Sequence, residues 1–127
     1  VGYADTDKMG FAHHSRFLVY LESARTELLR STGDSYHAWE QRGVLLPVVR
    51  ANLEFSKPAY YDDVLSIDVE IVELTRLRLK FSYRIRCAER GVQIASGETY
   101  HVFMSEAVKP IRVDDSFLQK LKPFLIG

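Results

Sequence analysis

Apolar residues in the first third of the chain recur at the spacing of an α-helix. The recurring positions are separated by four, three and four residues and are Phe17, Leu21, Ala24 and Leu28. This spacing places them on one face of a helix. Ser15 can cap its start, and Gly33 can supply the left-handed residue beyond its end. The pattern predicts one long amphipathic helix over residues 15–32, with a shorter helical turn over residues 35–41.

From residue 49 onward the apolar positions alternate with polar ones, as in strands that have one face on a core and one in water. The alternation predicts strands over residues 49–55, 65–71, 77–87 and 92–104. The phase slips at Val72, which predicts a β-bulge. Gly97, inside the last strand, predicts either a bulge or the close approach of another backbone.

Both ends of the sequence indicate short elements. Val1 and Tyr3 alternate with smaller residues, which predicts the end of a strand running into a loop rich in Asp and Gly. Asp114 or Asp115 can cap a short terminal helix that extends to Lys122.

The predicted order is a strand, a long helix and then about four consecutive strands joined by tight turns. This order is typical of an α+β fold, with an antiparallel sheet and a helix packed on one face. The sheet should curl around the apolar helix and leave edge strands that a second copy of the chain could cover. We therefore expect a homo-oligomer, and residues 1–127 fit a single domain.

Composition narrows the choice of partner and compartment. Seventeen Lys and Arg residues balance seventeen Asp and Glu residues, so nucleic acid is not an expected partner. The single cysteine, Cys87, cannot form an intrachain disulfide, which favours a reducing compartment such as the cytoplasm. No apolar run approaches the roughly 18 residues of a membrane helix, so no membrane span is expected.

Several common catalytic motifs are absent from the sequence, namely GxSxG, GxGxxG, GxxxxGK[ST], HExxH and paired cysteines. The sequence therefore lacks the simplest signatures of serine hydrolases, nucleotide hydrolases and zinc enzymes. His13 and His14 are adjacent, whereas two helical ligands of one metal ion need a spacing near four. We expect no metal site.

Residues able to do chemistry converge in residues 3–14, directly before the long helix. A helix start has unpaired backbone N–H groups and a partial positive charge, so it can stabilise negative charge on a carbonyl oxygen. Asp7, on a glycine-containing loop, could fold back to attack an acyl carbon or to deprotonate a water. However, Asp-Thr-Asp before a helix is often turn and capping chemistry, and His14 is as often structural as catalytic. The residues alone leave both readings open.

The segment Tyr-x-Asp-Thr-Asp-x-x-Gly-x-x-x-His, followed by Glu22-Ser23-Ala24-Arg25-Thr26-Glu27, resembles the 4-hydroxybenzoyl-CoA thioesterase-like branch of the hotdog-fold acyl-CoA thioesterases. The resemblance covers nearly the whole chain. It implies a curved antiparallel sheet wrapped around one long central helix, and dimers or homotetramers with active sites between subunits. The implied reaction is cleavage of an acyl thioester to a free acid and coenzyme A, with no cofactor or metal beyond the coenzyme A of the substrate.

Transferred residue by residue, the resemblance implies that Asp7 is the catalytic carboxylate, as nucleophile or general base. His14 matches the motif histidine, where a backbone N–H of the helix start polarises the thioester carbonyl. Tyr3, Gly10 and Phe11 are expected to contact substrate. Asp5 matches the first acid of the motif, and we expect it to be structural.

Coenzyme A also carries phosphates, which need Lys or Arg near the mouth of the site. The basic residues near strand ends or turns are Arg50, Lys57, Arg76, Lys109 and Arg112. Among them we select Lys57 and Arg76 as substrate-binding candidates.

A second basic row, formed by Arg78, Lys80, Arg84 and Arg86, looks like an anion patch. A hairpin register that keeps the apolar faces together sets this row opposite Asp68 and Glu70. Cross-strand ion pairs on a solvated face therefore explain the row more simply.

Two other functions remain open at this point. The same fold could run a different acyl-thioester reaction, such as dehydration or isomerisation, or the chain could bind an acyl group or coenzyme A without catalysis. An acyl-carrier thioester is an alternative substrate to acyl-CoA. Assays with hydroxyacyl and enoyl thioesters, and binding of coenzyme A without hydrolysis, separate these readings.

Overall fold

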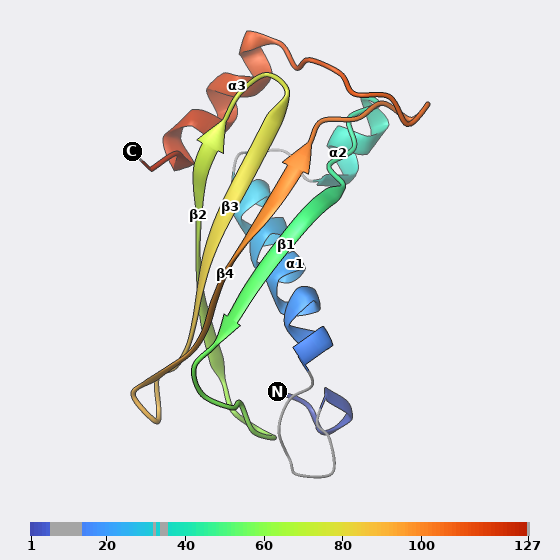
Figure 1. Cartoon of the computed structure of the whole chain (residues 1–127). Coiled ribbons are helices and arrows are strands. Elements are labelled where there is room, and N and C mark those ends of the chain that lie inside the picture. The colour runs from blue at the N-terminus through green and yellow to red at the C-terminus, as the bar shows by residue number, and fades with distance from the viewer. Residues whose placement is uncertain (6–13, 32, 34–35, 127) are drawn as a thin grey trace.

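The computed structural model describes residues 1–5, 14–31, 33 and 36–126. It contains an antiparallel sheet with a long helix beside it (Figure 1). The helices are α1 (His14–Arg30), α2 (Tyr36–Gln41) and α3 (Asp115–Leu121), with 3-10 helices at Tyr3–Asp5 and Lys122–Phe124. The strands are β1 (Val48–Phe55), β2 (Leu65–Leu74), β3 (Arg78–Cys87) and β4 (Val92–Val102).

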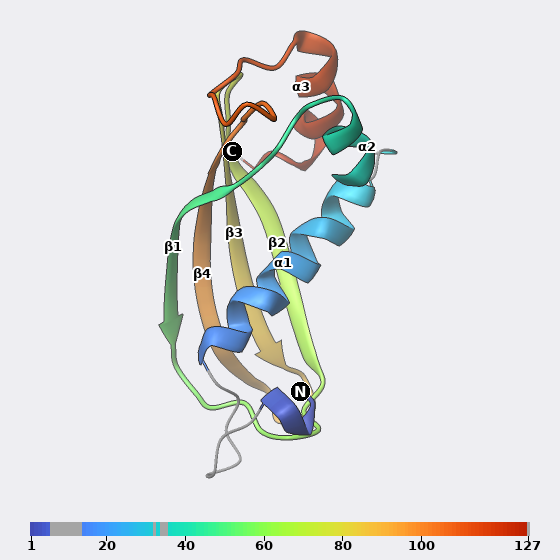
Figure 2. The same cartoon turned by 90° about the vertical axis from the view of Figure 1, so that its right-hand side faces the viewer.

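The described strands form one sheet in the order β1-β4-β3-β2, and all neighbours are antiparallel. The strands bend together, and α1 lies along the concave side of the sheet (Figure 2). The predicted α+β architecture, a curved antiparallel sheet around one long helix, is confirmed.

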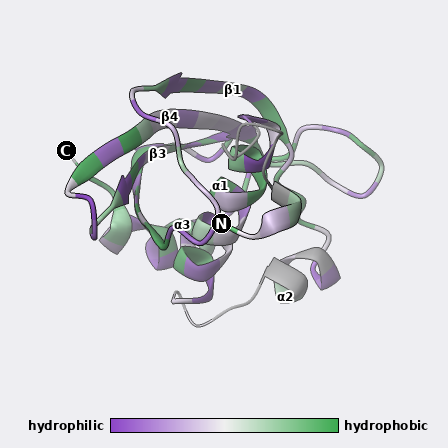
Figure 3. Ribbon diagram, turned by 90° about the horizontal axis from the view of Figure 1, so that it is seen from below, coloured by the Kyte–Doolittle hydropathy of each residue, from purple (hydrophilic) through white to green (hydrophobic). Residues whose placement is uncertain are grey.

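Alternation along the strands builds the core. Every second residue of β3 is almost fully buried, and these residues are Leu79, Phe81, Tyr83, Ile85 and Cys87. They face α1, whose buried side chains are Phe17, Leu21 and Leu29. Bands of hydrophobic and hydrophilic residues alternate along β1 (Figure 3). Burial of this apolar surface is the main force that holds the helix on the sheet.

Both irregularities predicted in the strands are present. The pairing of β2 with β3 shifts register between Ile71 and Glu73, which is the bulge expected at Val72. At Gly97, a Cβ atom would lie 2.5 Å from the backbone oxygen of Asn52 on the neighbouring β1. Gly97 therefore marks a close approach of another backbone, and the bulge of β4 falls instead at Ile94, between the partners of Ile85 and Arg86.

The predicted strand end at Val1–Tyr3 is wrong, because Tyr3–Asp5 forms a 3-10 helix. Val1 exchanges backbone hydrogen bonds with the loop before β2. Its ammonium group donates to the Asp63 carbonyl oxygen at 2.6 Å, and Asp62 N–H donates to the Val1 carbonyl oxygen at 2.8 Å. The chain turns immediately afterwards, so a ladder cannot continue to Tyr3.

The terminal helix begins as predicted. The carboxylate of Asp114 accepts a hydrogen bond from the backbone N–H of Phe117 at 2.9 Å and caps α3. None of the helices in the described part of the chain is long and apolar enough to cross a membrane.

Candidate functional site

Helix α1 begins at His14, the last residue of the motif-bearing segment. Its first turn contains no acidic side chain, so no carboxylate of that turn neutralises the partial positive charge of the helix start. The first backbone N–H groups of a helix lack intrahelical acceptors. This end of α1 can therefore stabilise an oxygen atom that gains negative charge.

The first turn of α1 packs against the last residue of β1 through aromatic rings. The rings of His14 and Phe55 are stacked, with centroids 3.8 Å apart and planes 7° from parallel. The ring of Phe17 meets Phe55 edge-on, at 5.0 Å and 87°. Phe55 is 36% exposed, so the contact lies at the surface of the molecule. The sequence alternation placed Phe55 on the core side of its strand, but nothing in it indicated the contact with His14.

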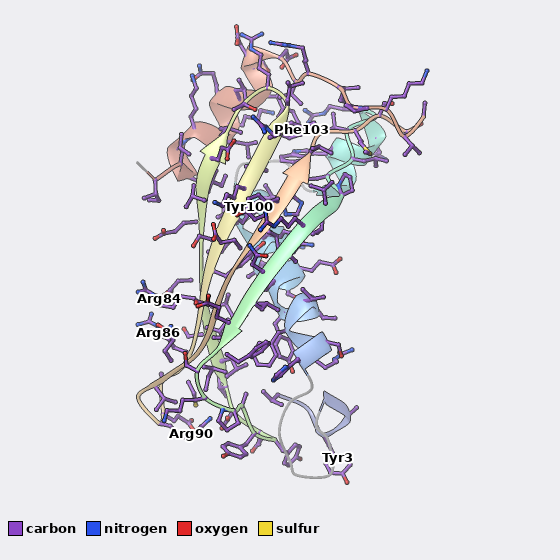
Figure 4. The ribbon with its side chains drawn as sticks, in the orientation of Figure 1. Tyr3, Arg84, Arg86, Arg90, Tyr100 and Phe103 are labelled. Carbon is purple, nitrogen blue, oxygen red and sulfur yellow. The ribbon has the colours of Figure 1, made fainter. Side chains whose placement is uncertain are left out.

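Other candidate residues lie at this same end of the molecule. Tyr3 is exposed and meets the ring of Tyr61 edge-on at 5.8 Å. Lys57 lies two residues after the end of β1 and is exposed. The labelled side chains of Tyr3 and Arg90 both lie at this end (Figure 4).

Arg90, which the sequence analysis did not single out, ties two loops together at this end. Its guanidinium donates to the carboxylate of Asp63 at 2.7 Å and to the carbonyl oxygen of Pro58 at 3.0 Å. It also lies over the ring of Tyr60, 4.8 Å from the centroid. The hairpin between β3 and β4 is thereby fixed to the loop between β1 and β2. A turn arginine gives no such signal in the sequence, because its partners lie about thirty residues away.

Arg76 lies at the opposite end of the sheet from Lys57. Its guanidinium pairs with Asp115, at the start of α3, and its carbonyl oxygen accepts from Val113 N–H at 2.9 Å. The ten residues of β2 separate the two ends, a rise of roughly 33 Å. The structure therefore does not bring Lys57 and Arg76 of one chain together. Asp7, Gly10 and Phe11 lie outside the described residues.

The second basic row is largely neutralised by ion pairs, as predicted, but Glu70, which was expected opposite the row, lies opposite Ser82. Arg86 pairs with Asp68 at 2.7 Å, Lys80 with Glu98 at 2.6 Å, and Arg78 with Glu73 at 3.9 Å. The hydrogen bond to Glu98 is the main reason that the pKa of Lys80 is raised. Arg84 is opposite Asp68 in the register, but Asp68 is already paired with Arg86. Arg84 and Arg86 point away from α1 (Figure 4).

A chain of buried polar groups lies between the sheet and α1. His101 Nδ1 is 3.2 Å from the Leu46 carbonyl oxygen, His101 Nε2 is 2.8 Å from Thr99 Oγ1, and Thr99 Oγ1 is 2.6 Å from the Tyr83 hydroxyl oxygen. Burial lowers the pKa of His101 to about 4, and the charge of Arg25 on α1 adds to this effect. His101 is therefore neutral at pH 7 and carries one ring proton.

The donor and the acceptor of each hydrogen bond in this series follow from the group at its end. The Leu46 carbonyl can only accept, so His101 Nδ1 carries the proton and Nε2 accepts from the Thr99 hydroxyl. Thr99 in turn accepts from the Tyr83 hydroxyl. Burial raises the pKa of Tyr83, and its interactions with Thr99 and Arg25 offset part of that rise. These hydrogen bonds thus connect β3, β4 and the segment before β1, and the direction of each hydroxyl proton is fixed.

A groove of about 590 Å³ separates α1 from β2. It is lined mainly along the second half of the helix, from Tyr20 to Ser31, and by Leu65, Ile67 and Val69 of the strand. His14 does not line it, so this groove is distinct from the helix start.

Comparison with known proteins shows to which family the chain belongs. A model of the thioesterase-like superfamily matches residues 1–121. The chain belongs to this family. It is 37% identical over 89 residues to the acyl-CoA thioester hydrolase YbgC of Escherichia coli, a match that covers 70% of this chain and 66% of that protein.

Solved structures of similar proteins share the fold. A hypothetical protein of Thermus thermophilus, TT1821, is 37% identical with a TM-score of 0.91, covering 98% of this chain and 94% of that one. The DHNA-CoA thioesterase of Staphylococcus aureus is 28% identical with a TM-score of 0.91, covering 97% and 85%. The hotdog fold implied by the sequence motif is confirmed, and the chain is a thioester hydrolase.

Proposed function

We propose that the chain hydrolyses acyl-CoA to a free acid and coenzyme A, with Asp7 as the catalytic carboxylate. Asp7 either attacks the acyl carbon, forming an anhydride that water then opens, or takes a proton from the attacking water. The backbone N–H groups of the first turn of α1, at His14, hold the carbonyl oxygen while it is negative. The sulfur leaves as the thiol of coenzyme A. No metal or cofactor other than the coenzyme A of the substrate takes part.

One observation carries the proposal. In a member of the thioesterase-like superfamily, α1 begins at His14, the last residue of the motif that contains Asp7. A carboxylate on the chain that enters a helix start can reach the same carbonyl group that the helix N–H groups polarise. The absence of an acid from the first turn supports this use of the helix start.

We further propose that the enzyme is a cytoplasmic dimer or a tetramer built from two such dimers, with substrate bound between subunits. Strand β1 is an edge of the described sheet, and its exposed apolar side chains are Val48, Val49 and Phe55. Antiparallel pairing of two β1 edges around a two-fold axis reverses one sheet relative to the other. Arg76 of the partner subunit would then lie at the end that carries Lys57, Tyr3 and the start of α1. Light scattering of the purified protein measures this assembly.

The activity is tested by thiol release from short, long and aromatic acyl-CoAs. We expect wild type to release thiol and Asp7→Asn to lose about 10²- to 10⁴-fold in kcat, which is the contribution that one such group commonly makes. Asp5→Asn, two residues upstream, is the matched control and should retain most of the activity. An acyl thioester of N-acetylcysteamine, which lacks the phosphates and adenine, measures how much the nucleotide part contributes to KM.

Other outcomes would contradict the proposal in distinct ways. Near-wild-type activity of Asp7→Asn removes Asp7 from the mechanism. Hydration or isomerisation of enoyl thioesters without thiol release indicates another acyl-thioester reaction. If wild type binds coenzyme A but cleaves no thioester, including acyl-carrier thioesters, the chain is a binding module.

A further inference from the structure

The ring of Phe55 is held by two residues of one helical turn. His14 and Phe17 are three positions apart, so their side chains lie on neighbouring parts of the same helix surface. The His14 ring stacks on Phe55 with centroids 3.8 Å apart, and the Phe17 ring is T-shaped to Phe55 with centroids 5.0 Å apart. Contacts with interplanar angles of 7° and 87° restrict the ring in different directions.

The ring contacts of Phe55 also restrict the position of helix α1. Phe55 is the last residue of β1, and its backbone pairs with that of Ala95, which is fully buried in β4. The ring therefore projects from a part of the sheet that cannot shift freely. An aliphatic side chain of similar size has no flat face for the imidazole and no quadrupole for the edge contact. The stack fixes the first turn of α1 relative to the end of β1.

We propose that Phe55 is a positioning residue for the helix-start N–H groups that polarise the thioester carbonyl. The inference rests on the proposed function, in which these N–H groups act at His14. Donors aimed at a developing oxyanion must be in place before the reaction, and a misplacement of about 1 Å can reduce the rate about 10²-fold. Because the donors act most strongly in the transition state, loss of Phe55 should lower kcat more than it changes KM.

The kinetic test compares Phe55→Leu with Phe55→Tyr. We expect Phe55→Leu to lower kcat about 10- to 100-fold with KM within about threefold of wild type, and Phe55→Tyr, which keeps the ring, to restore most of kcat. Phe124→Leu is the matched control, because Phe124 is half-buried in the 3-10 helix Lys122–Phe124 at the other end of the molecule. It should leave kcat unchanged.

Nuclear magnetic resonance tests the contact without reference to activity. A ring stacked at 3.8 Å shifts the imidazole protons of His14 upfield; the shift should be present in wild type and Phe55→Tyr and absent in Phe55→Leu. Urea unfolding shows whether each variant is folded, and Phe55→Met, which keeps side-chain length without a ring, replaces the Leu variant if that one unfolds.

The outcomes separate the two proposals. An active wild type whose Phe55→Leu variant keeps full kcat overturns the role of Phe55 alone, as does wild-type protein without the upfield shift. A wild type that hydrolyses no thioester overturns the proposed function and the positioning role together.

Discussion

The polar side chains on the two faces of the sheet differ in their access to water. On the side toward α1, Thr99 and His101 are each 1% exposed and take part in a directed hydrogen-bond chain with Tyr83. On the outer side, the ion pair of Arg86 with Asp68 joins side chains that are about half exposed. Water can replace a lost partner on the outer face but not beneath the helix. The contribution of a polar group to stability therefore depends on its access to water more than on its charge.

The largest effect should come from breaking the buried chain at its centre. Thr99→Val keeps the side-chain shape but leaves the Tyr83 hydroxyl without an acceptor and His101 Nε2 without a donor. We expect the free energy of unfolding to fall by about 2–4 kcal/mol, since each buried unsatisfied group costs about 1–3 kcal/mol. Urea unfolding measures the change. Thr99→Ser, which retains the hydroxyl, should recover most of the loss; equal losses in both variants would show that packing and not hydrogen bonding is responsible.

Acid should weaken the fold through the same chain. His101 has a pKa of about 4 in the folded state against 6.5 ordinarily, so the unfolded chain binds a proton more readily. The free energy of unfolding is therefore not reduced by His101 above pH 6.5, and it decreases as the pH falls from 6.5 toward 4. The loss at pH 5 is about 2 kcal/mol. Unfolding of wild type and His101→Gln between pH 7.5 and 4.5 isolates this effect, because Gln does not titrate; parallel pH profiles would contradict the assigned cause.

The smallest effect should come from the outer face. Asp68→Asn removes the charge that pairs with Arg86 and should lower the free energy of unfolding by less than about 1 kcal/mol. The difference from wild type should shrink further in 1 M salt, where charges are screened over about 3 Å. A loss as large as that of Thr99→Val would erase the distinction between the two faces.

The distance along the chain between a residue and its partners explains which functional residues the sequence could identify. The motif from Tyr3 to His14 is contiguous, so it can be identified from the local spacing of its residues. Phe55 and Arg90 act through partners that lie far away in the chain, at His14 and Asp63 respectively. Their residue types and neighbours in the sequence are ordinary for a strand end and a turn.

The sequence by itself determined the long helix, the four strands of the sheet and the pairing of β2 with β3. Periods of about 3.6 and 2 predicted α1 and the strands, the phase slip at Val72 predicted the bulge, and the apolar alternation predicted the even-to-even register of β2 with β3. These are consequences of side-chain direction in helices and strands, which depends on local backbone geometry alone.

Tertiary structure decided the remaining features, because they depend on distances between segments. It turned Tyr3–Asp5 into a 3-10 helix, placed Lys57 and Arg76 at opposite ends of the sheet, and set the ring of Phe55 against the first turn of α1. Such contacts arise when burial of the apolar surfaces of α1 and the sheet fixes how the segments lie against each other. No local pattern encodes that geometry, so the direction of the buried hydrogen bonds and the setting of the helix start appear only in the folded molecule.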